Sequence, residues 1–391
     1  MASDANTQGK INADGKREVV MIGNHLAALA AVDSGCRFFG GYPITPSTEV
    51  MEAMSDFLPR EGGTCVQMED EIAGVAVATG ASMSGVKSMT ATSGPGISLK
   101  AENLGLAQIA EVPLVVVNVM RGGPSTGLPT RVAQGDIAQA KNPSHGDYKS
   151  IALCAGTLAE CYTETARAFN LADRFMQPVF VLLDATLGLM HAKAILPTVE
   201  EVEAAIVPRK TFDGPAEDYR PYGVEQDEAA VLNPMFQGYR YHFTGLHHDA
   251  MGFPTEEIET CRKLIDRLFN KVDAHRDEIE LNEEYLLDDA DILLIGYGSA
   301  SLGIKEAVNR MRAEGIKVGM FRPITIWPSP EERMYELGQK FDKVLSVELN
   351  QGQYLEEIQR CMGRRDIQKL TKTNGRPFSP KDIIDKVKEV F

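Results

Sequence analysis

The sequence predicts an α/β protein in which a parallel-sheet domain is followed by a smaller α/β domain. Short apolar segments alternate with helical segments through the first half of the chain, a spacing typical of parallel strands connected by helices. The clearest strand is Leu114 to Met120, which is nearly continuous in apolar residues and rich in valine, as expected for a strand buried on both faces. A second strand–loop–helix–strand unit begins at Ile292.

The first domain is expected to span residues 18–196, after a polar, disordered tail over residues 1–17. Its strands are expected at residues 19–22, 36–41, 64–68, 87–91, 114–120, 151–153 and 178–183. Its helices are expected at residues 23–35, 47–58, 72–84, 99–109 and 157–175. The helix over residues 72–84 consists almost entirely of small residues, so we expect it to be buried and to approach a sheet or another helix closely.

The pattern becomes less regular over residues 197–289, which we expect to form an irregular excursion and linker with one helix inside it. The second domain then spans residues 290–391. Its glycine loop, Gly296 to Ser299, does not match the GxGxxG fingerprint of nicotinamide-binding proteins, and a tight strand-to-helix turn explains it better.

Composition excludes several classes of function. The chain has 391 residues, 43% of them apolar and 24% charged, which is ordinary for a globular protein with a substantial core. Its formal net charge of −15 argues against nucleic acid or an anionic membrane as the partner. No apolar run approaches the roughly 20 residues of a membrane-spanning helix, and the polar start lacks the apolar segment of a signal peptide. We therefore expect a cytoplasmic protein.

The six cysteines have no CxxC spacing, and most lie in apolar segments. They are therefore expected to be reduced, small buried side chains. This chain is expected to hold no metal site and no iron–sulfur cluster of its own.

A stiff loop, Tyr42-Pro43-Ile44-Thr45-Pro46, follows one predicted strand and precedes a predicted helix. Each proline fixes its own backbone and keeps the residue before it extended. Loops between strand and helix are where α/β proteins bind ligands. The alternative is that Thr45 caps the helix and Pro46 is its first residue, which requires no ligand.

Two charged residues also follow predicted strands. Glu71 stands at the start of the small-residue helix, where it could stabilise the helix dipole or, if buried, bind a ring nitrogen of a ligand. Arg121 stands at the carboxyl end of the central strand, where its planar guanidinium suits a carboxylate or phosphate. The loop Gly94-Pro95-Gly96 is either a plain turn or a point of close approach to a ligand.

Four ordered motifs together resemble the α subunit of the 2-oxoacid:ferredoxin oxidoreductases, most closely the branch that acts on 2-oxoglutarate. The motifs are YPITPSTE from Tyr42, EDEIA from Glu69, TATSGPG from Thr90 and RGGPSTGLPT from Arg121. The resemblance continues through His247-His248-Asp249 to the segment Glu348 to Gln353. It implies a pyrimidine-binding domain of the thiamine diphosphate enzymes, followed by a domain like the C-terminal one of transketolase.

The resemblance also implies roles for particular residues. Glu71 would hydrogen-bond the pyrimidine ring of thiamine diphosphate, and Thr45 and Arg121 would hold the carboxylate and carbonyl of the 2-oxoacid. These three would be the catalytic residues. The remaining cofactor contacts would come from Tyr42, Pro43, Ile44, Gly94 and Pro95. Ser125 and Thr126 would line the substrate pocket.

The motifs that this family needs for the cofactor diphosphate and its Mg²⁺, and for a [4Fe-4S] cluster, are absent from the sequence. The resemblance therefore implies a β subunit that carries them, in an α2β2 assembly. Coenzyme A would be the co-substrate and ferredoxin the redox partner, and ferredoxin would dock on the β subunit because this chain is acidic. Physiologically the reaction could run in either direction, including reductive CO2 fixation.

Three alternatives stay open at this point. The enzyme could act on pyruvate or a branched 2-oxoacid instead of 2-oxoglutarate. The SGPG loop is also similar to that of acetolactate synthase-type enzymes, although those hold both cofactor-binding domains in one longer chain. The chain could, finally, be a non-catalytic assembly or regulatory subunit that keeps the fold.

Overall fold

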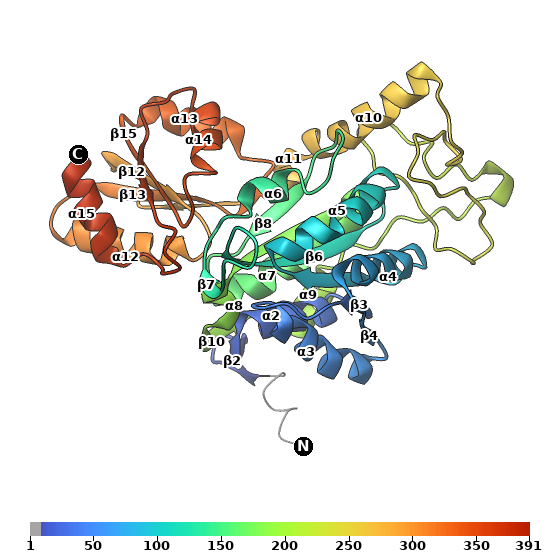
Figure 1. Ribbon diagram of the computed structural model, residues 1–391, viewed down its shortest axis with the longest axis horizontal. Coiled ribbons are helices and arrows are strands. Elements are labelled where there is room, and N and C mark those ends of the chain that lie inside the picture. The colour runs from blue at the N-terminus through green and yellow to red at the C-terminus, as the bar shows by residue number, and fades with distance from the viewer. Residues whose placement is uncertain (1–8) are drawn as a thin grey trace.

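The computed structural model describes residues 9–391 and contains two α/β domains (Figure 1). The larger sheet has the strand order β14-β8-β9-β6-β5-β3-β4, with β7 paired to β6. Its strands are β3 (Phe38–Gly41), β4 (Thr64–Gln67), β5 (Ser88–Thr92), β6 (Leu114–Gly122), β7 (Leu128–Val132), β8 (Ile151–Cys154), β9 (Pro178–Asp184) and β14 (Thr325–Trp327). The pairs from β4 to β8 are parallel, as predicted, whereas β7 and β14 are antiparallel.

Helices cover the faces of this sheet (Figure 1). They are α2 (Gly23–Asp33), α3 (Thr48–Phe57), α4 (Glu71–Met83), α5 (Gly94–Ile109), α6 (Ile137–Lys141), α7 (Leu158–Phe175) and α8 (Ala185–Leu189). The predicted strands and helices of the first domain are all present, with ends shifted by a few residues. No helix between residues 9 and 391 is long and apolar enough to cross a membrane.

The first strand departs from the prediction. Strand β2 (Arg17–Ile22) does not join the large sheet but lies in a small antiparallel sheet with β1 (Lys10–Ile11) and β10 (His191–Leu196). The prediction of a disordered tail is therefore wrong for residues 10–17, because β1 pairs with β2 and the side chain of Asn12 accepts hydrogen bonds from the intervening turn. Residues 1–8 of that predicted tail lie outside the described chain.

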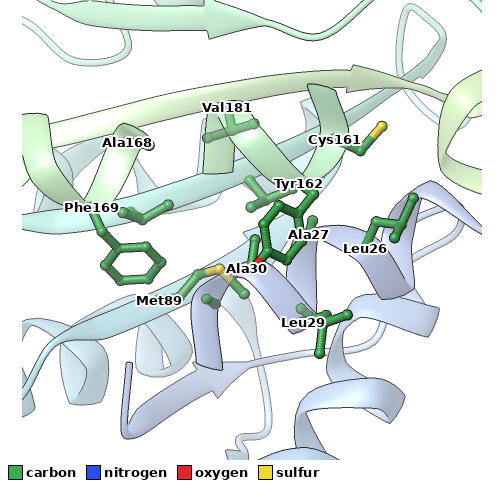
Figure 2. Packing of buried hydrophobic residues seen from close by; sticks show 14 of the residues in the cluster. Leu26, Ala27, Leu29, Ala30, Met89, Cys161, Tyr162, Ala168, Phe169 and Val181 are labelled. Carbon is green, nitrogen blue, oxygen red and sulfur yellow. The ribbon is translucent and has the colours of Figure 1, made fainter. Parts of the chain in front are cut away.

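The main core lies between the sheet and the layer formed by α2 and α7. Figure 2 shows Tyr162 of α7 lying over Ala27 and Ala30 of α2, and all three belong to this core together with Leu26 and Phe169. The Tyr162 hydroxyl donates a hydrogen bond to Asp33 at 2.5 Å, and the same carboxylate pairs with Arg17 at 2.6 Å. The alanines let α2 lie close to α7, and the polar trio fixes the end of α2.

Helix α4 crosses the carboxyl end of β3 at very short range. A Cβ on Gly40 would lie 2.6 Å from the Gly74 carbonyl oxygen, and a Cβ on Gly74 would lie 3.0 Å from the Gly41 Cα. The predicted close approach of the small-residue helix is therefore confirmed. Its burial is partial, since Ile72 on the opposite face is 46% exposed.

The second domain has a five-stranded sheet of order β11-β13-β12-β15-β16, parallel except at β11. Its strands are β11 (Asn282–Tyr285), β12 (Ile292–Gly296), β13 (Val318–Pro323), β15 (Lys343–Glu348) and β16 (Gln368–Thr371). Its helices are α12 (Ala300–Ala313), α13 (Glu331–Lys340), α14 (Leu355–Met362) and α15 (Pro380–Val390). Strand β14 leaves this domain and extends the sheet of the first one.

The motif from Glu348 to Gln353 joins the two domains. Asn350 donates a hydrogen bond to the Gln134 carbonyl oxygen at 2.8 Å, and the Gln134 side chain bonds the main chains of Tyr297 and Leu349. Gln353 donates to the carbonyl oxygen of Gly135 at 2.7 Å. The second domain thus holds the loop that follows β7.

The loops in the middle of the excursion, before α10, lie at the end of the first domain away from the second domain (Figure 1). It contains α9 (Val199–Ala204) and the 3-10 turn η2 (Ala216–Asp218), and the chain returns through α10 (Ile258–Asp273) and α11 (Arg276–Ile279). Helix α10 is anchored by a buried ion cluster in which Glu111 contacts Arg267 at 2.5 Å and Lys271 at 2.9 Å. The predicted helix within the irregular stretch is confirmed as α10.

Candidate active site

The sequence motifs converge at one edge of the large sheet. Strands β6, β5, β3 and β4 are consecutive neighbours and run parallel, so their carboxyl ends meet at the same edge. The proline loop follows β3, Glu71 follows β4, Gly94 follows β5 and Arg121 lies near the end of β6. The carboxyl edge of an open α/β sheet is where such folds bind ligands.

The loop from Tyr42 to Pro46 lies outside the following helix. Helix α3 begins at Thr48, with Ser47 as its flanking residue and no side-chain cap. The alternative that Thr45 caps this helix is therefore wrong. The loop is held instead from its ends: Ser47 donates to the carbonyl oxygen of Ile44, and Asn24 donates to that of Pro46 at 2.7 Å. Thr45, followed by a cis peptide bond, is exposed at the edge of the sheet.

Arg121 connects this loop to the central strand. Its Nη1 donates a hydrogen bond to the main-chain oxygen of Thr45 at 2.5 Å, and the residue is 7% exposed. Its Nε is buried without a hydrogen-bond partner among the described residues. The structure therefore brings Thr45 and Arg121 together, and it leaves donor capacity on the guanidinium for an anionic ligand.

Glu71 is the first residue of α4 and is 5% exposed. The capping role at this helix end belongs to its neighbour Asp70, whose side chain accepts a hydrogen bond from the Ala73 N–H at 2.7 Å. No hydrogen bond to the Glu71 carboxylate is found within residues 9–391, and its oxygens are not among the fully buried atoms that lack a partner. The carboxyl group is therefore available to a ligand at the edge of the sheet that offers a donor.

The sequence prediction of a tight loop at Gly94-Pro95-Gly96 is wrong, because these residues form the first turn of α5. The helix can include Pro95 in its first turn, because the N–H groups of a first turn have no partner within the helix. The N–H that proline lacks is therefore not missed at this position. A Cβ on Gly96 would lie 2.9 Å from the Glu71 Oε1, and one on Gly94 would lie 2.7 Å from a carboxylate oxygen of Asp136. Carboxylates of the chain itself therefore lie close to both glycines.

Among the described residues, Ser125 and Thr126 form no side-chain hydrogen bond with the other predicted site residues. They occupy the exposed tip of the hairpin between β6 and β7, and Ser125 has a φ of 56°. Gly127 is required in this turn, since a Cβ there would lie 2.0 Å from the Gly122 carbonyl oxygen. In this chain alone the hairpin tip faces outward.

Two buried polar residues near the site were not singled out in the sequence analysis. Lys100 of α5 is fully buried beside Glu71. Its position in a helix among apolar residues is the sequence feature that indicates its burial. Asp136 lies beside Gly94 and accepts a hydrogen bond from Asn118 at 3.1 Å. Burial raises the pKa of Asp136, against the opposing effects of Asn118 and Arg121. No sequence pattern indicates that Asp136 is buried, because its loop is held in place by hydrogen bonds from the second domain.

The residue types at this edge are those that would hold an aminopyrimidine ring. Glu71 places a carboxyl group here, and only glycine at position 96 leaves room for that group, because a Cβ there would lie 2.9 Å from its Oε1. A hollow of about 670 Å³ lies elsewhere and is lined in part by Arg17 of β2, Asp33 of α2 and Glu203 of α9. The candidate site itself is an open edge of the sheet, where Thr45, Ser125 and Thr126 are exposed.

Comparison with known protein families agrees with this geometry. Residues 29–267 match the family model described as pyruvate flavodoxin/ferredoxin oxidoreductase, thiamine diphosphate-binding. Residues 290–383 match the model of the pyruvate:ferredoxin oxidoreductase core domain II.

Individual relatives cover nearly all of the chain. The 2-oxoglutarate synthase subunit KorA of Methanothermobacter marburgensis is 43% identical over 95% of this chain and 98% of its own length. The ketoisovalerate oxidoreductase subunit VorB of Methanothermobacter thermautotrophicus is 34% identical over 94% of this chain and 96% of its own. A solved structure, the 2-oxoglutarate:ferredoxin oxidoreductase of Magnetococcus marinus with 2-oxoglutarate, coenzyme A and succinyl-CoA bound, superposes with a TM-score of 0.89 at 37% identity. That match covers 96% of this chain and 66% of the other. The protein therefore belongs to the family of 2-oxoacid:ferredoxin oxidoreductases.

Proposed function

We propose that this chain is the α subunit of a thiamine diphosphate-dependent 2-oxoglutarate:ferredoxin oxidoreductase. The reaction is 2-oxoglutarate + coenzyme A + oxidised ferredoxin giving succinyl-CoA + CO2 + reduced ferredoxin, with two electrons leaving the substrate. The supporting observation is the nearly buried Glu71, whose carboxyl group has no hydrogen-bond partner found in the described chain and lies at the same sheet edge as Arg121 and the Thr45 loop. Identity of 43% to a 2-oxoglutarate synthase subunit selects the substrate class.

The chain's own residues have distinct roles in this proposal. Glu71 holds a proton between its carboxyl oxygen and a ring nitrogen of the pyrimidine, and thereby orients the cofactor. Tyr42, Pro43, Ile44, Gly94 and Pro95 shape the walls around it. When bound, thiamine diphosphate supplies the electron sink that lets the substrate carboxyl group leave as CO2.

Arg121 and Thr45 hold the 2-oxoacid. The guanidinium attracts the substrate carboxylate, and its bond to the Thr45 main chain fixes the loop that presents the threonine hydroxyl. Rigid placement of this kind lowers the entropic part of the barrier. Ser125 and Thr126, on the exposed hairpin, complete the pocket in this proposal once a partner subunit packs against that edge.

The open site requires a second subunit. Relatives are named as subunits, which supports an assembly of several chains. We propose that a β subunit supplies the diphosphate and Mg²⁺ site and the [4Fe-4S] cluster, in an α2β2 complex, and that ferredoxin docks there. Such a protein operates in the cytoplasm, where coenzyme A and reduced ferredoxin are available.

A branched 2-oxoacid is the second candidate substrate, because the ketoisovalerate oxidoreductase subunit is 34% identical to this chain.

The function is tested by co-purifying the chain with its β subunit and measuring coenzyme A-dependent dye reduction with 2-oxoglutarate, pyruvate and 2-oxoisovalerate. We expect kcat/KM to be at least tenfold higher for 2-oxoglutarate. A preference for one of the other acids would transfer the assignment to that branch, and no turnover with any of them would indicate a non-catalytic subunit.

A further inference from the structure

A lysine lies inside the protein directly behind the candidate catalytic glutamate. Lys100 belongs to α5 and is 0% exposed. Lysine is almost never fully buried unless it is paired, because its ammonium group loses its hydration. Its presence at this position therefore needs an explanation.

The contacts of Lys100 point toward Glu71. Its Nζ donates hydrogen bonds to the main-chain oxygen of Glu71 at 3.2 Å and to the Oγ1 of Thr90 at 3.1 Å. Both acceptors are neutral. Across the described part of the chain, no carboxylate oxygen lies within ion-pair distance of this ammonium group.

The charged groups that face Lys100 are Glu71 and Asp70, both at the start of α4. Asp70 is already engaged as the cap of that helix. Strand β5 offers only the Thr90 hydroxyl in this direction, among the residues that the structure describes. Glu71 is therefore the carboxylate toward which the charge of the buried ammonium group is directed.

Burial lowers the pKa of Lys100 to about 8, and the nearby Glu71 and Asp70 counteract part of that effect. The ammonium form is thus present at neutral pH and is lost as the pH rises through 8. A hydrophobic side chain such as methionine would pack α5 against α4 without the desolvation cost of a charge. Packing alone consequently does not account for the lysine.

We propose that Lys100 is a positioning residue for Glu71: its buried positive charge attracts the Glu71 carboxylate, and its hydrogen bond to the Glu71 main chain holds the first turn of α4, so that the carboxyl group stays in place for the ring nitrogen of the bound pyrimidine. This inference rests on the proposed function. No covalent step is involved.

The test compares Lys100→Met with the wild type in the co-purified complex. The readout is the affinity for thiamine diphosphate between pH 6.5 and 9.0, measured by calorimetry in buffers of different ionisation enthalpy so that protons are counted. We expect the wild-type affinity to fall about tenfold as Lys100 loses its proton above pH 8. The variant should bind about tenfold more weakly at pH 7 and show no further change between pH 7 and 9.

Lys87→Met is the matched control, because Lys87 is another mostly buried lysine, next to the amino end of β5, and pairs with Asp173 away from the site. It should leave the affinity and its pH dependence unchanged. Lys100→Gln keeps a hydrogen-bond donor without the charge and covers the case in which the methionine variant does not assemble. Either Lys100 variant with wild-type affinity and pH dependence would overturn the inference.

A second readout isolates the path through Glu71. In the Glu71→Gln background, Lys100→Met should have less than a twofold effect on affinity, because the carboxylate that it positions is gone. An undiminished effect there would mean that Lys100 acts structurally and would also overturn the inference. If the wild-type complex binds no thiamine diphosphate at all, the proposed function fails instead.

Discussion

At the scale of single residues, the site depends on charges that are buried and incompletely satisfied. Arg121 uses one nitrogen to hold the Thr45 loop and has another buried without a partner in residues 9–391. Glu71 is 5% exposed, and no hydrogen bond to its carboxylate is found in the described chain. Proteins seldom retain a buried donor such as the Arg121 Nε without a partner, because it costs desolvation free energy without a compensating bond. A ligand that bonds both groups accounts for their placement at this edge.

Replacing Arg121 by methionine should therefore impair substrate binding. We expect kcat/KM for 2-oxoglutarate to fall on the order of 10- to 100-fold, the equivalent of losing one charge-assisted hydrogen bond of about 1.5–3 kcal/mol. Arg131→Met is the control, since Arg131 is exposed on β7. Equal kinetics for the two variants would remove Arg121 from the substrate site.

At the scale of elements, sequence patterns predicted what is local and missed what depends on distant partners. Apolar runs and helix signals predict the parallel strands and the longer helices between residues 36 and 183, and they place Thr45, Glu71 and Arg121 at one sheet edge. They do not predict the short elements β7 and α6. The sequence does not predict the sheet that β2 joins, because its partner β10 lies about 170 residues later in the chain. It predicts a loop where α5 begins, because glycine and proline are also strong turn residues.

The buried ion cluster should dominate the attachment of α10. Glu111 is completely buried between Arg267 and Lys271, and their charges outweigh burial, so the pKa of Glu111 lies below its usual value of 4.5. Glu111→Gln leaves two buried cations uncompensated and should lower the free energy of unfolding by about 3–5 kcal/mol. Chemical denaturation followed by circular dichroism measures this loss.

The same ion cluster should make the free energy of unfolding fall at low pH. Because the folded-state pKa of Glu111 is depressed, its contribution is fully present above pH 4.5 and is lost as the pH falls through the folded-state value. The difference between wild type and Glu111→Gln should therefore shrink below pH 4.5. A difference that stays constant there would contradict the charge pairing.

The contact between domains is also an element-scale prediction. Asn350 bonds the Gln134 carbonyl and the Tyr297 hydroxyl and accepts from two N–H groups of its own turn. With roughly 1 kcal/mol for each bond lost, Asn350→Ala should destabilise the chain by about 2–4 kcal/mol. Its neighbour Gln351 is exposed, so Gln351→Ala should change the unfolding midpoint little. Similar midpoints for the two variants would mean that the motif does not join the domains.

At the scale of the whole molecule, the chain has two coupled domains and an open functional edge. The second domain contributes β14 to the large sheet and holds the loop after β7, so both domains shape the side of the site next to Asp136. The chain places Glu71, Thr45 and Arg121 along one sheet edge but does not enclose them. An enzyme built from this chain is therefore expected to need a partner that closes the site, and the purified chain alone should be inactive.

The central claim is that this chain contributes the pyrimidine-binding half of a shared active site through Glu71. The most direct measurement compares Glu71→Ala and Glu69→Ala in the co-purified complex, by coenzyme A-dependent dye reduction with 2-oxoglutarate and by thiamine diphosphate binding. Glu69 is exposed two residues away, so its variant serves as the control. We predict that Glu71→Ala lowers kcat at least 100-fold, about 2.7 kcal/mol of barrier, whereas Glu69→Ala stays within twofold of wild type. Full activity of the Glu71→Ala complex would contradict the claim.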